Sequence, residues 1–414
     1  MKGGFSAVFM ALCLSLSAHS AERRLCEAHE VAKGSRPFVA SDGNSRLYAV
    51  FEGYDGGKQA PGIFCSTSSD CGATWSPRQS ISRMQSASEH PAVAVEKSGA
   101  IDVVWSSNGT DLKSSDIFFV RSADGAKTWS EPLDISNTPG PSAEPAIAIG
   151  PDDSIHIAFT DTATGDNNKD IFYVCSKAGE KQSATLPFLP AVDISNTPGA
   201  SSEPDLVVTP EGIVHVVWVD TTSGETRPDI YSARREHESW TEAVDVSRSA
   251  RVSTHPSLAC DKGKVFLAWS DNSRKETAAD IWVDIGNRKG KFSKPINISD
   301  TPGWSDEPRA FASNGQLVVV WTDTSTGTLS PSIYARVTPD VGQDFTSVMN
   351  MSQAQCMSKH PSVTIAGGKM IVLWQEIVGD DSTIKVTSIK LKGLPTGPPM
   401  AVDPTLHGVA GNMH

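Results

Sequence analysis

The stretch DISNTPGPSAEP, Asp134 to Pro145, decides the fold because the chain repeats it. DISNTPGASSEP returns at Asp193 to Pro204, and NISDTPGWSDEP at Asn297 to Pro308. Each copy ends on a proline that opens an apolar run. Aligned on this proline, the chain has seven repeats, beginning at Pro37, Pro91, Pro145, Pro204, Pro256, Pro308 and Pro361, spaced 52 to 59 residues apart. A period of this length indicates a repeat architecture.

Each repeat holds short apolar segments without helical periodicity. One segment follows the proline, and a second ends in an aromatic residue, as in IDVVW and VHVVW. A third resembles DIFFV and a fourth AVDIS. Four short strands per repeat are typical of propeller blades. We therefore predict an all-β, seven-bladed β-propeller of four-stranded antiparallel blades over residues 22–393.

The seventh repeat lacks a fourth strand of its own. Residues 25–31 stand where VDIS stands in the other repeats. We therefore expect the N-terminal strand to complete this blade and close the ring, which removes exposed sheet edges. The tail, residues 394–414, is rich in Pro and Gly, and we expect it to be flexible.

The first 21 residues have the composition of a signal peptide. Lys2 precedes the apolar run FSAVFMALCLSLSA, and the small residues of AHSA follow it. The run is too short to be a confident membrane span. We expect a mature protein that is periplasmic or secreted, with no membrane span, and that is a monomer.

The net charge limits the kinds of partner that the chain can bind. A net charge of -12 over 414 residues argues against a nucleic-acid partner, which favours a basic face.

The cysteines of the mature chain offer one candidate disulfide. Export permits disulfides, and Cys65 and Cys71 flank a tight turn, so they are the best candidate pair. The remaining four cysteines of the mature chain cannot be paired from sequence, and they show no metal-binding spacing. Those four are Cys26, Cys175, Cys260 and Cys356.

Two turns between third and fourth strands carry a recognisable motif. SSDCGATW in the first repeat has the S-x-D-x-G-x-T-W spacing, and SADGAKTW in the second matches it with the glycine shifted by one. These turns resemble the Asp-boxes (BNR repeats) of the sialidase-like superfamily of propellers. The matching residues are Ser68, Asp70, Gly72, Trp75, Ser122, Asp124 and Trp129. Their oxygens suit turn backbone donors, so we interpret them as structural.

The resemblance also implies a possible glycosidase site. A sialidase of this superfamily uses arginines to hold the sugar carboxylate, a Tyr-Glu nucleophile pair and an Asp acid. Arg36 matches the first arginine, but the other repeats offer no equivalent one. As an enzyme the chain would use Asp55 and Glu203, a glutamate opposite, for acid and base chemistry. Tyr231 and Tyr334 fall in third strands, where core packing is the simpler interpretation.

The residue before each anchor proline is ionisable in all seven repeats. These residues, which we name the axial ring, are Arg36, His90, Glu144, Glu203, His255, Glu307 and His360. In a structural interpretation they are held extended and bond the next blade's backbone as latches. In a functional interpretation they converge on the mouth of the central tunnel and bind a glycan or a small polar ligand. A divalent metal is a further alternative, although no cofactor is required.

Two other features are expected on the same face of the propeller as the axial ring. An acidic residue follows the second-strand aromatic after one position, at Asp161, Asp220, Asp271, Asp323 and Glu376. These residues either start Asx-type turns or form an acidic rim. Trp304 stands where the other copies have Pro141 or Ala200, and an indole there either stacks on a sugar ring or packs between blades.

Three functions follow from these observations. We favour a propeller that binds a glycan or another polar ligand through Trp304 and the axial ring, including Arg36. The alternatives are a sialidase-like glycoside hydrolase anchored by Arg36, and a protein-interaction scaffold, because the fold alone does not fix function.

Overall fold

The computed structural model describes residues 26–56, 60–84, 86–108, 114–163, 168–176, 188–275, 278–292, 294–325, 330–339, 344–353 and 356–394. The predicted signal peptide lies outside these residues, as does all of the predicted flexible tail except its first residue. Within them the chain forms 29 strands and no helix, so this part of the chain contains no helix that could cross a membrane.

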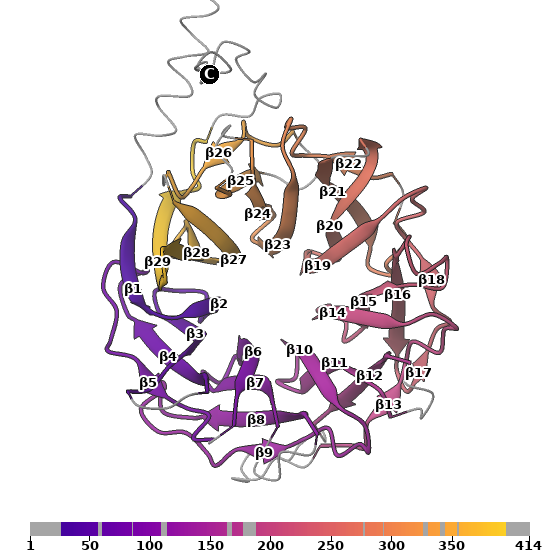
Figure 1. Cartoon of the computed structure of the whole chain (residues 1–414), viewed down its shortest axis with the longest axis horizontal. Helices are drawn as coiled ribbons and strands as arrows, with labels where there is room; N and C mark the ends of the chain where they lie inside the picture. The colour runs from indigo at the N-terminus through magenta and orange to yellow at the C-terminus, as the bar shows by residue number, and fades with distance from the viewer. Residues whose placement is uncertain are drawn as a thin grey trace, which may run out of the picture.

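The strands form seven antiparallel sheets arranged as a ring (Figure 1), which confirms the predicted propeller. Blade one contains β2 (Ser35–Ser41), β3 (Leu47–Gly53), β4 (Gly62–Ser68) and β5 (Gln79–Ser80). Blade two contains β6 (Ser88–Val95), β7 (Ile101–Ser107), β8 (Asp116–Ser122) and β9 (Leu133–Asp134). Blade three contains β10 (Ser142–Ile149), β11 (Ile155–Asp161), β12 (Asp170–Cys175) and β13 (Val192–Asp193). Blade four contains β14 (Ser201–Val208), β15 (Val214–Asp220), β16 (Asp229–Glu236), β17 (Ser239–Trp240) and β18 (Val244–Asp245). Blade five contains β19 (Ser253–Asp261), β20 (Lys264–Lys275), β21 (Ala278–Asn287) and β22 (Ile296–Asn297). Blade six contains β23 (Ser305–Ser313), β24 (Gln316–Asp323), β25 (Ser332–Thr338) and β26 (Met349–Asn350).

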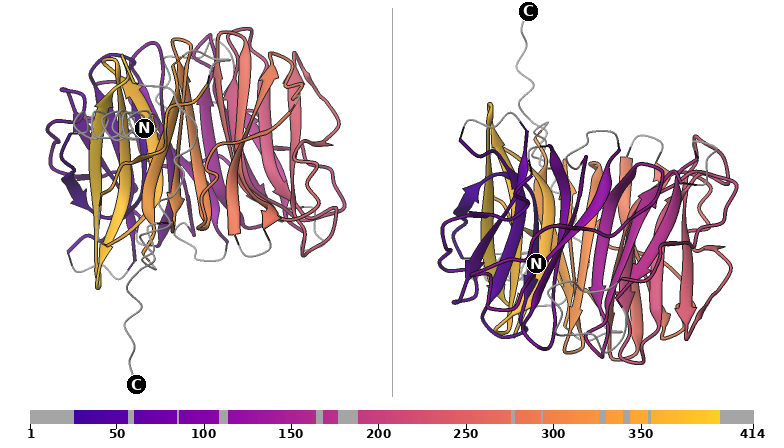
Figure 2. Two further views of the ribbon diagram at one scale, coloured as in Figure 1. Left: turned by 90° about the horizontal axis from the view of Figure 1, so that it is seen from above. Right: turned by 90° about the horizontal axis from the view of Figure 1, so that it is seen from below.

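Blade seven combines the two ends of the described chain. It contains β27 (Met357–Ala366), β28 (Lys369–Val378), β29 (Asp381–Lys390) and, as its outer strand, β1 (His29–Lys33). β1 pairs antiparallel with β29, and the Cys26 N–H also donates to the Ser388 carbonyl at 2.9 Å. The side views in Figure 2 show the blades standing side by side around the axis.

The core lies between neighbouring blades. The second strand of each blade is buried along most of its length, because it has neighbours in its own sheet and sheets on both faces. Its terminal aromatic is at most 2% exposed in the five blades that place a tryptophan there. Those residues are Trp105, Trp218, Trp269, Trp321 and Trp374. Tyr231 and Tyr334 pack against the same inter-blade clusters.

The repeated phrase is explained by hydrogen bonds to one buried aspartate in each of blades three, four and six. In blade three, Asp161 Oδ2 accepts from Thr138 Oγ1 at 2.6 Å and from Ser142 Oγ at 2.5 Å. Its Oδ1 accepts from the Ala163 N–H at 2.6 Å. A Cβ on Gly140 would lie 2.7 Å from the Thr162 carbonyl carbon and from the Ala163 nitrogen, so only glycine fits there.

The equivalent aspartates make the same bonds in other blades. Asp220 and Asp323 each accept from the Thr and Ser of their own copy of the phrase and from the indole two residues earlier. All are fully buried. These carboxylates therefore start turns and hold the connection between blades; they do not form an acidic rim.

The two Asp-box turns have internal hydrogen bonds of the kind their sequence suggests. Ser68 Oγ accepts from the Gly72 N–H at 2.9 Å, and Asp70 accepts from the Thr74 N–H and hydroxyl at 2.9 and 2.6 Å. The hydrogen bonds from Thr74 lower the pKa of Asp70 to about 2. Ser122 and Asp124 make the same pattern in blade two.

The predicted Cys65–Cys71 disulfide is wrong. Both thiols are free in this structure, as are the other four described cysteines. Cys65 lies in the cluster between blades one and two, whereas Cys71 packs against the cluster between blades seven and one. The two side chains thus point to opposite faces of blade one, which closeness in sequence does not reveal.

Candidate functional site

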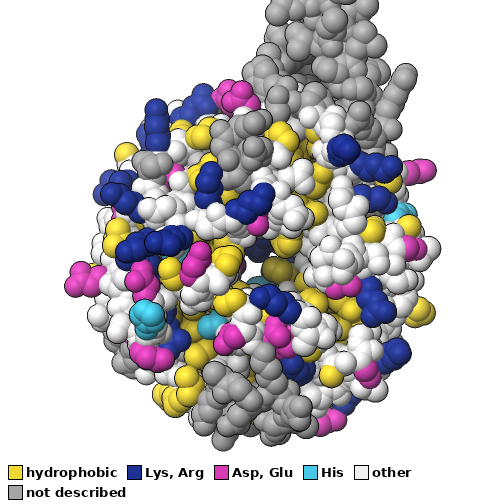
Figure 3. Space-filling view, turned by 180° about the vertical axis from the view of Figure 1, so that it is seen from behind, with side chains coloured by type: hydrophobic (Ala, Val, Ile, Leu, Met, Phe, Trp, Pro, Cys, Tyr) yellow, Lys and Arg dark blue, Asp and Glu magenta, His cyan; other side chains and the backbone are white. Residues whose placement is uncertain are grey.

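All seven axial-ring residues stand at the start of the innermost strands, which surround the axis (Figure 1). In every blade the pairing of the first with the second strand shifts register at the ring residue and its proline, which marks a β-bulge. The space-filling view of one face shows the ring hollowed at its centre, with basic, acidic and histidine side chains around the opening (Figure 3).

The expectation that these residues are extended is wrong. Each has a positive φ, between 45° and 55°. A non-glycine residue in this region costs of order 1–3 kcal/mol and persists only where its surroundings hold it. The bulge leaves the ring residue's N–H free of the strand pairing, so another acceptor must take it.

Side chains from the preceding blade supply that acceptor. Glu144 accepts from the Glu203 N–H, Glu203 from the His255 N–H, and Glu307 from the His360 N–H, at 2.9–3.0 Å. These three carboxylates therefore act as the latches of the structural interpretation. Each fixes the strained backbone of the next blade, and the glutamates are not free side chains pointing into the tunnel.

Two further latches come from residues outside the predicted axial ring. Glu52 accepts from the His90 N–H at 3.0 Å, and Gln375 Oε1 accepts from the Arg36 N–H at 3.4 Å. Both stand one residue after the second-strand aromatic, where Thr160 and Thr322 instead donate to the ring glutamates Glu144 and Glu307. The only signal in the sequence was a long hydrogen-bond acceptor at this position in blades one and seven, where blades two and five have Ser106 and Ser270.

Blade one therefore carries a cluster of its own. Arg36 Nη1 lies 3.4 Å from Glu52 Oε1 and 3.3 Å from His90 Nε2. The Arg36 side chain is 42% exposed, whereas that of Glu52 is 9% exposed. Glu52 thus anchors one edge of the guanidinium, while the Arg36 side chain remains partly open to solvent.

The His90 imidazole in this cluster is neutral. Burial lowers its pKa, and the positive charge of Arg36 lowers it further. Because the guanidinium always donates, Nε2 accepts and Nδ1 carries the hydrogen. Nδ1 is buried and has no hydrogen-bond partner among the described residues. A buried donor without a partner is unusual in folded proteins.

A second cluster joins blades five and six. His255 Nδ1 lies 2.8 Å from Asp306 Oδ1, and Nε2 lies 3.7 Å from Glu203 Oε1. Burial alone would lower the pKa of His255, but the bond to Asp306 and the neighbouring carboxylates outweigh it and raise the pKa to about 9. His255 is therefore a cation at neutral pH.

Trp304 stands beside this second cluster and does not pack between blades. Its indole Nε1 donates to Asp306 Oδ2 at 3.3 Å, and its backbone N–H donates to Thr324 Oγ1 at 2.9 Å. The residue is 42% exposed, one of few large hydrophobic residues that are exposed in the described chain. The bond to Asp306 fixes the ring plane while leaving apolar surface open to a ligand.

The candidate catalytic carboxylates lie apart. Asp55 is exposed just after β3 of blade one, and Glu203 lies in β14 of blade four, across the ring in Figure 1. No group of three or more His, Cys, Asp or Glu side chains arranged to hold a metal occurs in the described part of the chain. The latch bonds account for this, because each ring carboxylate is turned toward its neighbour's backbone.

Comparison with known proteins places the fold and leaves the ligand open. No protein-family model matches the chain, and no curated protein matches its sequence. An α-L-arabinanase of Penicillium chrysogenum, complexed with arabinobiose, is 14% identical, with a TM-score of 0.52 over 74% of this chain and 94% of that one. The GH93 α-L-arabinofuranosidase of Fusarium graminearum, also with arabinobiose, is 13% identical, with a TM-score of 0.51 over 73% and 93%.

A sialidase of Trypanosoma rangeli in complex with sialic acid is also similar, at 14% identity and a TM-score of 0.48. The match covers 78% of this chain and 56% of that protein, so this chain matches little more than half of its length. At 13–14% identity, the similarity to the arabinanase and the arabinofuranosidase shows a shared fold and no more. The predicted β-propeller is thus confirmed at the level of its architecture.

Proposed function

We propose that this chain is a glycan-binding propeller whose ligand sits at the mouth of the central tunnel, with Arg36 as the anchor for a negative or strongly polar group. The observation that carries the proposal is the Arg36 cluster. Its guanidinium is positioned by Glu52 and His90 but remains 42% exposed, and an arginine held in this way is pre-organised to bind carboxylate oxygens.

Two features support a sugar as the ligand. Trp304 offers an exposed ring whose orientation is fixed by Asp306, and such rings stack on apolar faces of sugars. The structural neighbours that share the fold were solved with arabinobiose, which fits a carbohydrate ligand.

The ring carboxylates favour binding over hydrolysis. Paired-carboxylate hydrolysis requires two groups roughly 5–10 Å apart on one sugar. Asp55 and Glu203 come from blades on opposite sides of the ring, and the Glu203 carboxylate is bonded to the His255 N–H. Glycoside hydrolysis remains the alternative, and the experiment below tests it as well. The signal-like N-terminus supports action in the periplasm or outside the cell.

The experiment is a binding survey with purified mature protein and sialylated, uronic-acid and neutral oligosaccharides. We expect saturable binding of an acidic glycan that weakens at least tenfold in Arg36→Gln, because a charge-assisted hydrogen bond contributes roughly 1.5–3 kcal/mol. Arg227→Gln, an exposed arginine in the loop after β15, is the charge-matched control. Equal binding by both variants would remove Arg36 from the site, and mass spectrometry of the incubated glycans reports any cleavage.

A further inference from the structure

A pocket on the other face of the propeller is not part of the tunnel mouth. It lies between the Asp-box turns of blades one and two and has a volume of about 380 Å³, within the range of small-molecule sites. The register of the paired strands shows on which face of the propeller this pocket lies. Ser68, where the first Asp-box begins, is level with Leu47 and Ser41, whereas the ring end of β2 is level with Glu52.

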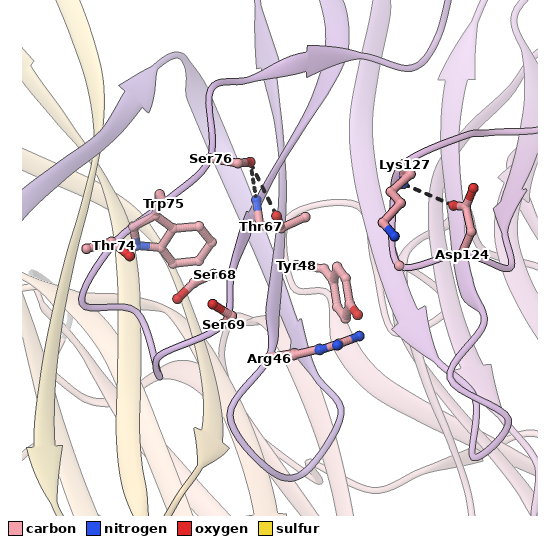
Figure 4. A pocket seen from close by; sticks show the side chains of 11 residues that line it. Arg46, Tyr48, Thr67, Ser68, Ser69, Thr74, Trp75, Ser76, Asp124 and Lys127 are labelled. Carbon is pink, nitrogen blue, oxygen red and sulfur yellow. Dashed lines mark hydrogen bonds between the residues drawn. The ribbon is translucent and has the colours of Figure 1, made fainter.

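Two cations from different blades border this pocket. Arg46 comes from the turn before β3, and Lys127 comes from the second Asp-box. Both side chains are exposed, and neither has an acidic partner among the described residues. The Arg46 Nη1 atom lies 3.6 Å from the position that a Cβ on Gly125 would occupy, so the guanidinium crosses from blade one to the turn of blade two. Figure 4 shows Arg46 and Lys127 on the two sides of one space.

The acidic residue in the pocket, Asp124, forms no ion pair with Arg46 or Lys127 among the described residues. Asp124 accepts hydrogen bonds from the hydroxyls of Ser122 and Thr128 and from the N–H groups of Lys127 and Thr128, at 2.6–3.0 Å. These bonds hold its carboxylate within its own turn. The Lys127 ammonium remains available to a ligand, because the residue contributes only its backbone N–H to Asp124.

The remaining wall suits a polyhydroxylated molecule. Tyr48 forms a buried aromatic surface beside Arg46, and Trp75 is partly exposed at the opposite edge (Figure 4). Exposed hydroxyls such as that of Ser69 line the space between them. Cations that bind an acid group, hydroxyls that bind ring hydroxyls and an aromatic edge for the apolar face together match an acidic sugar.

We infer that this pocket is a second ligand site, which binds one carboxylated sugar unit through Arg46 and Lys127. The site is independent of the proposed function, since it lies on the opposite face and shares no residue with the tunnel mouth. A chain with both sites would hold an acidic polysaccharide at two points, which raises the effective concentration of each contact.

Isothermal titration of the mature protein tests the inference with three probes: a glucuronate-containing tetrasaccharide, a neutral glucose tetrasaccharide and inorganic sulfate. The double variant R46Q/K127Q removes both cations. The matched control K291Q/K294Q removes two exposed lysines from the loop after β21 of blade five, on the same face. Arg36→Gln isolates the tunnel mouth.

We expect the acidic tetrasaccharide to bind, and R46Q/K127Q to lose one site or at least tenfold in affinity, because each cation contributes a charge-assisted bond. K291Q/K294Q and Arg36→Gln should retain that site. Unchanged binding by R46Q/K127Q overturns the inference, as does sulfate binding as tight as that of the sugar. Binding lost only in Arg36→Gln also overturns it, while supporting the tunnel-mouth proposal. Far-ultraviolet circular dichroism checks that each variant is folded.

Discussion

The Glu307 carboxylate holds His360 in two ways: it accepts the His360 backbone N–H at 2.9 Å, and its other oxygen lies 3.1 Å from the imidazole Nδ1. His360 has a φ of 49°, so the bond fixes a backbone conformation that the residue alone disfavours. One side chain thus joins blade six to blade seven and compensates for strain at the tunnel mouth.

Loss of this latch should destabilise the propeller. We expect Glu307→Ala to lower the free energy of unfolding by roughly 1.5–3 kcal/mol, because the His360 N–H loses a charged acceptor. Glu307→Gln should cost less, since its amide oxygen can accept as Gln375 does for Arg36. The midpoint of urea unfolding measures both variants. Equal losses in Ala and Gln would show that the charge, and not the acceptor, provides the stability.

The His255–Asp306 pair predicts a loss of stability at high pH. The folded-state pKa of His255 is raised from 6.5 to about 9, so the protonated form stabilises the fold. This contribution is fully present below about pH 6.5 and is lost as the pH rises through 9. Wild-type protein should therefore lose stability between pH 6.5 and 9 relative to His255→Gln.

Nuclear magnetic resonance of the His255 ring checks the cause. In Asp306→Asn the imidazole loses its hydrogen-bonded negative partner, so the pKa should fall toward the ordinary value. Asp300→Asn, which removes an exposed carboxylate from the preceding turn, is the control and should leave His255 unchanged. A His255 pKa near 6.5 in the wild-type protein would contradict the assigned pairing.

The glycine of the repeated phrase gives a purely steric test. Gly140→Ala would place a Cβ 2.7 Å from backbone atoms of Thr162 and Ala163, which cannot yield without moving the connection between blades. We expect a loss of roughly 1–3 kcal/mol in stability. Gly56→Ala meets no atom within 4 Å and should be neutral. A stable Gly140→Ala protein would mean that the connection adjusts freely.

The architecture could be predicted from the sequence because every blade repeats the same sequence pattern. The proline spacing and the second-strand aromatics predicted seven blades, and the buried Trp218 and Trp321 match that pattern. Local motifs were also informative where their partners are close in sequence, as for Ser68 and Asp70. In each case short-range chemistry and the final structure agree.

The site was harder to predict from the sequence because its contacts join residues of different blades. The general preference of residues before proline for extended backbone is overridden at Arg36 and His90 by acceptors on neighbouring strands. The residue types at Glu52 and Gln375 are the only trace of this role in the sequence, and they do not show which backbone N–H each side chain accepts. Cys65 and Cys71 failed as a pair for a similar reason, because strand direction sends their side chains to different inter-blade clusters.

Trp304 offers a test that separates binding from stability. Its side chain is 42% exposed and bonded only to Asp306, so Trp304→Ala should change the free energy of unfolding by less than about 1 kcal/mol. The same change should weaken glycan binding roughly tenfold, because stacking on an aromatic ring contributes of order 1 kcal/mol or more. Trp304→Phe keeps a ring but loses the indole donor that orients it, and should bind with intermediate affinity. Equal glycan affinity in wild type and Trp304→Ala would place the sugar elsewhere on the ring and leave Arg36 as its sole tested contact.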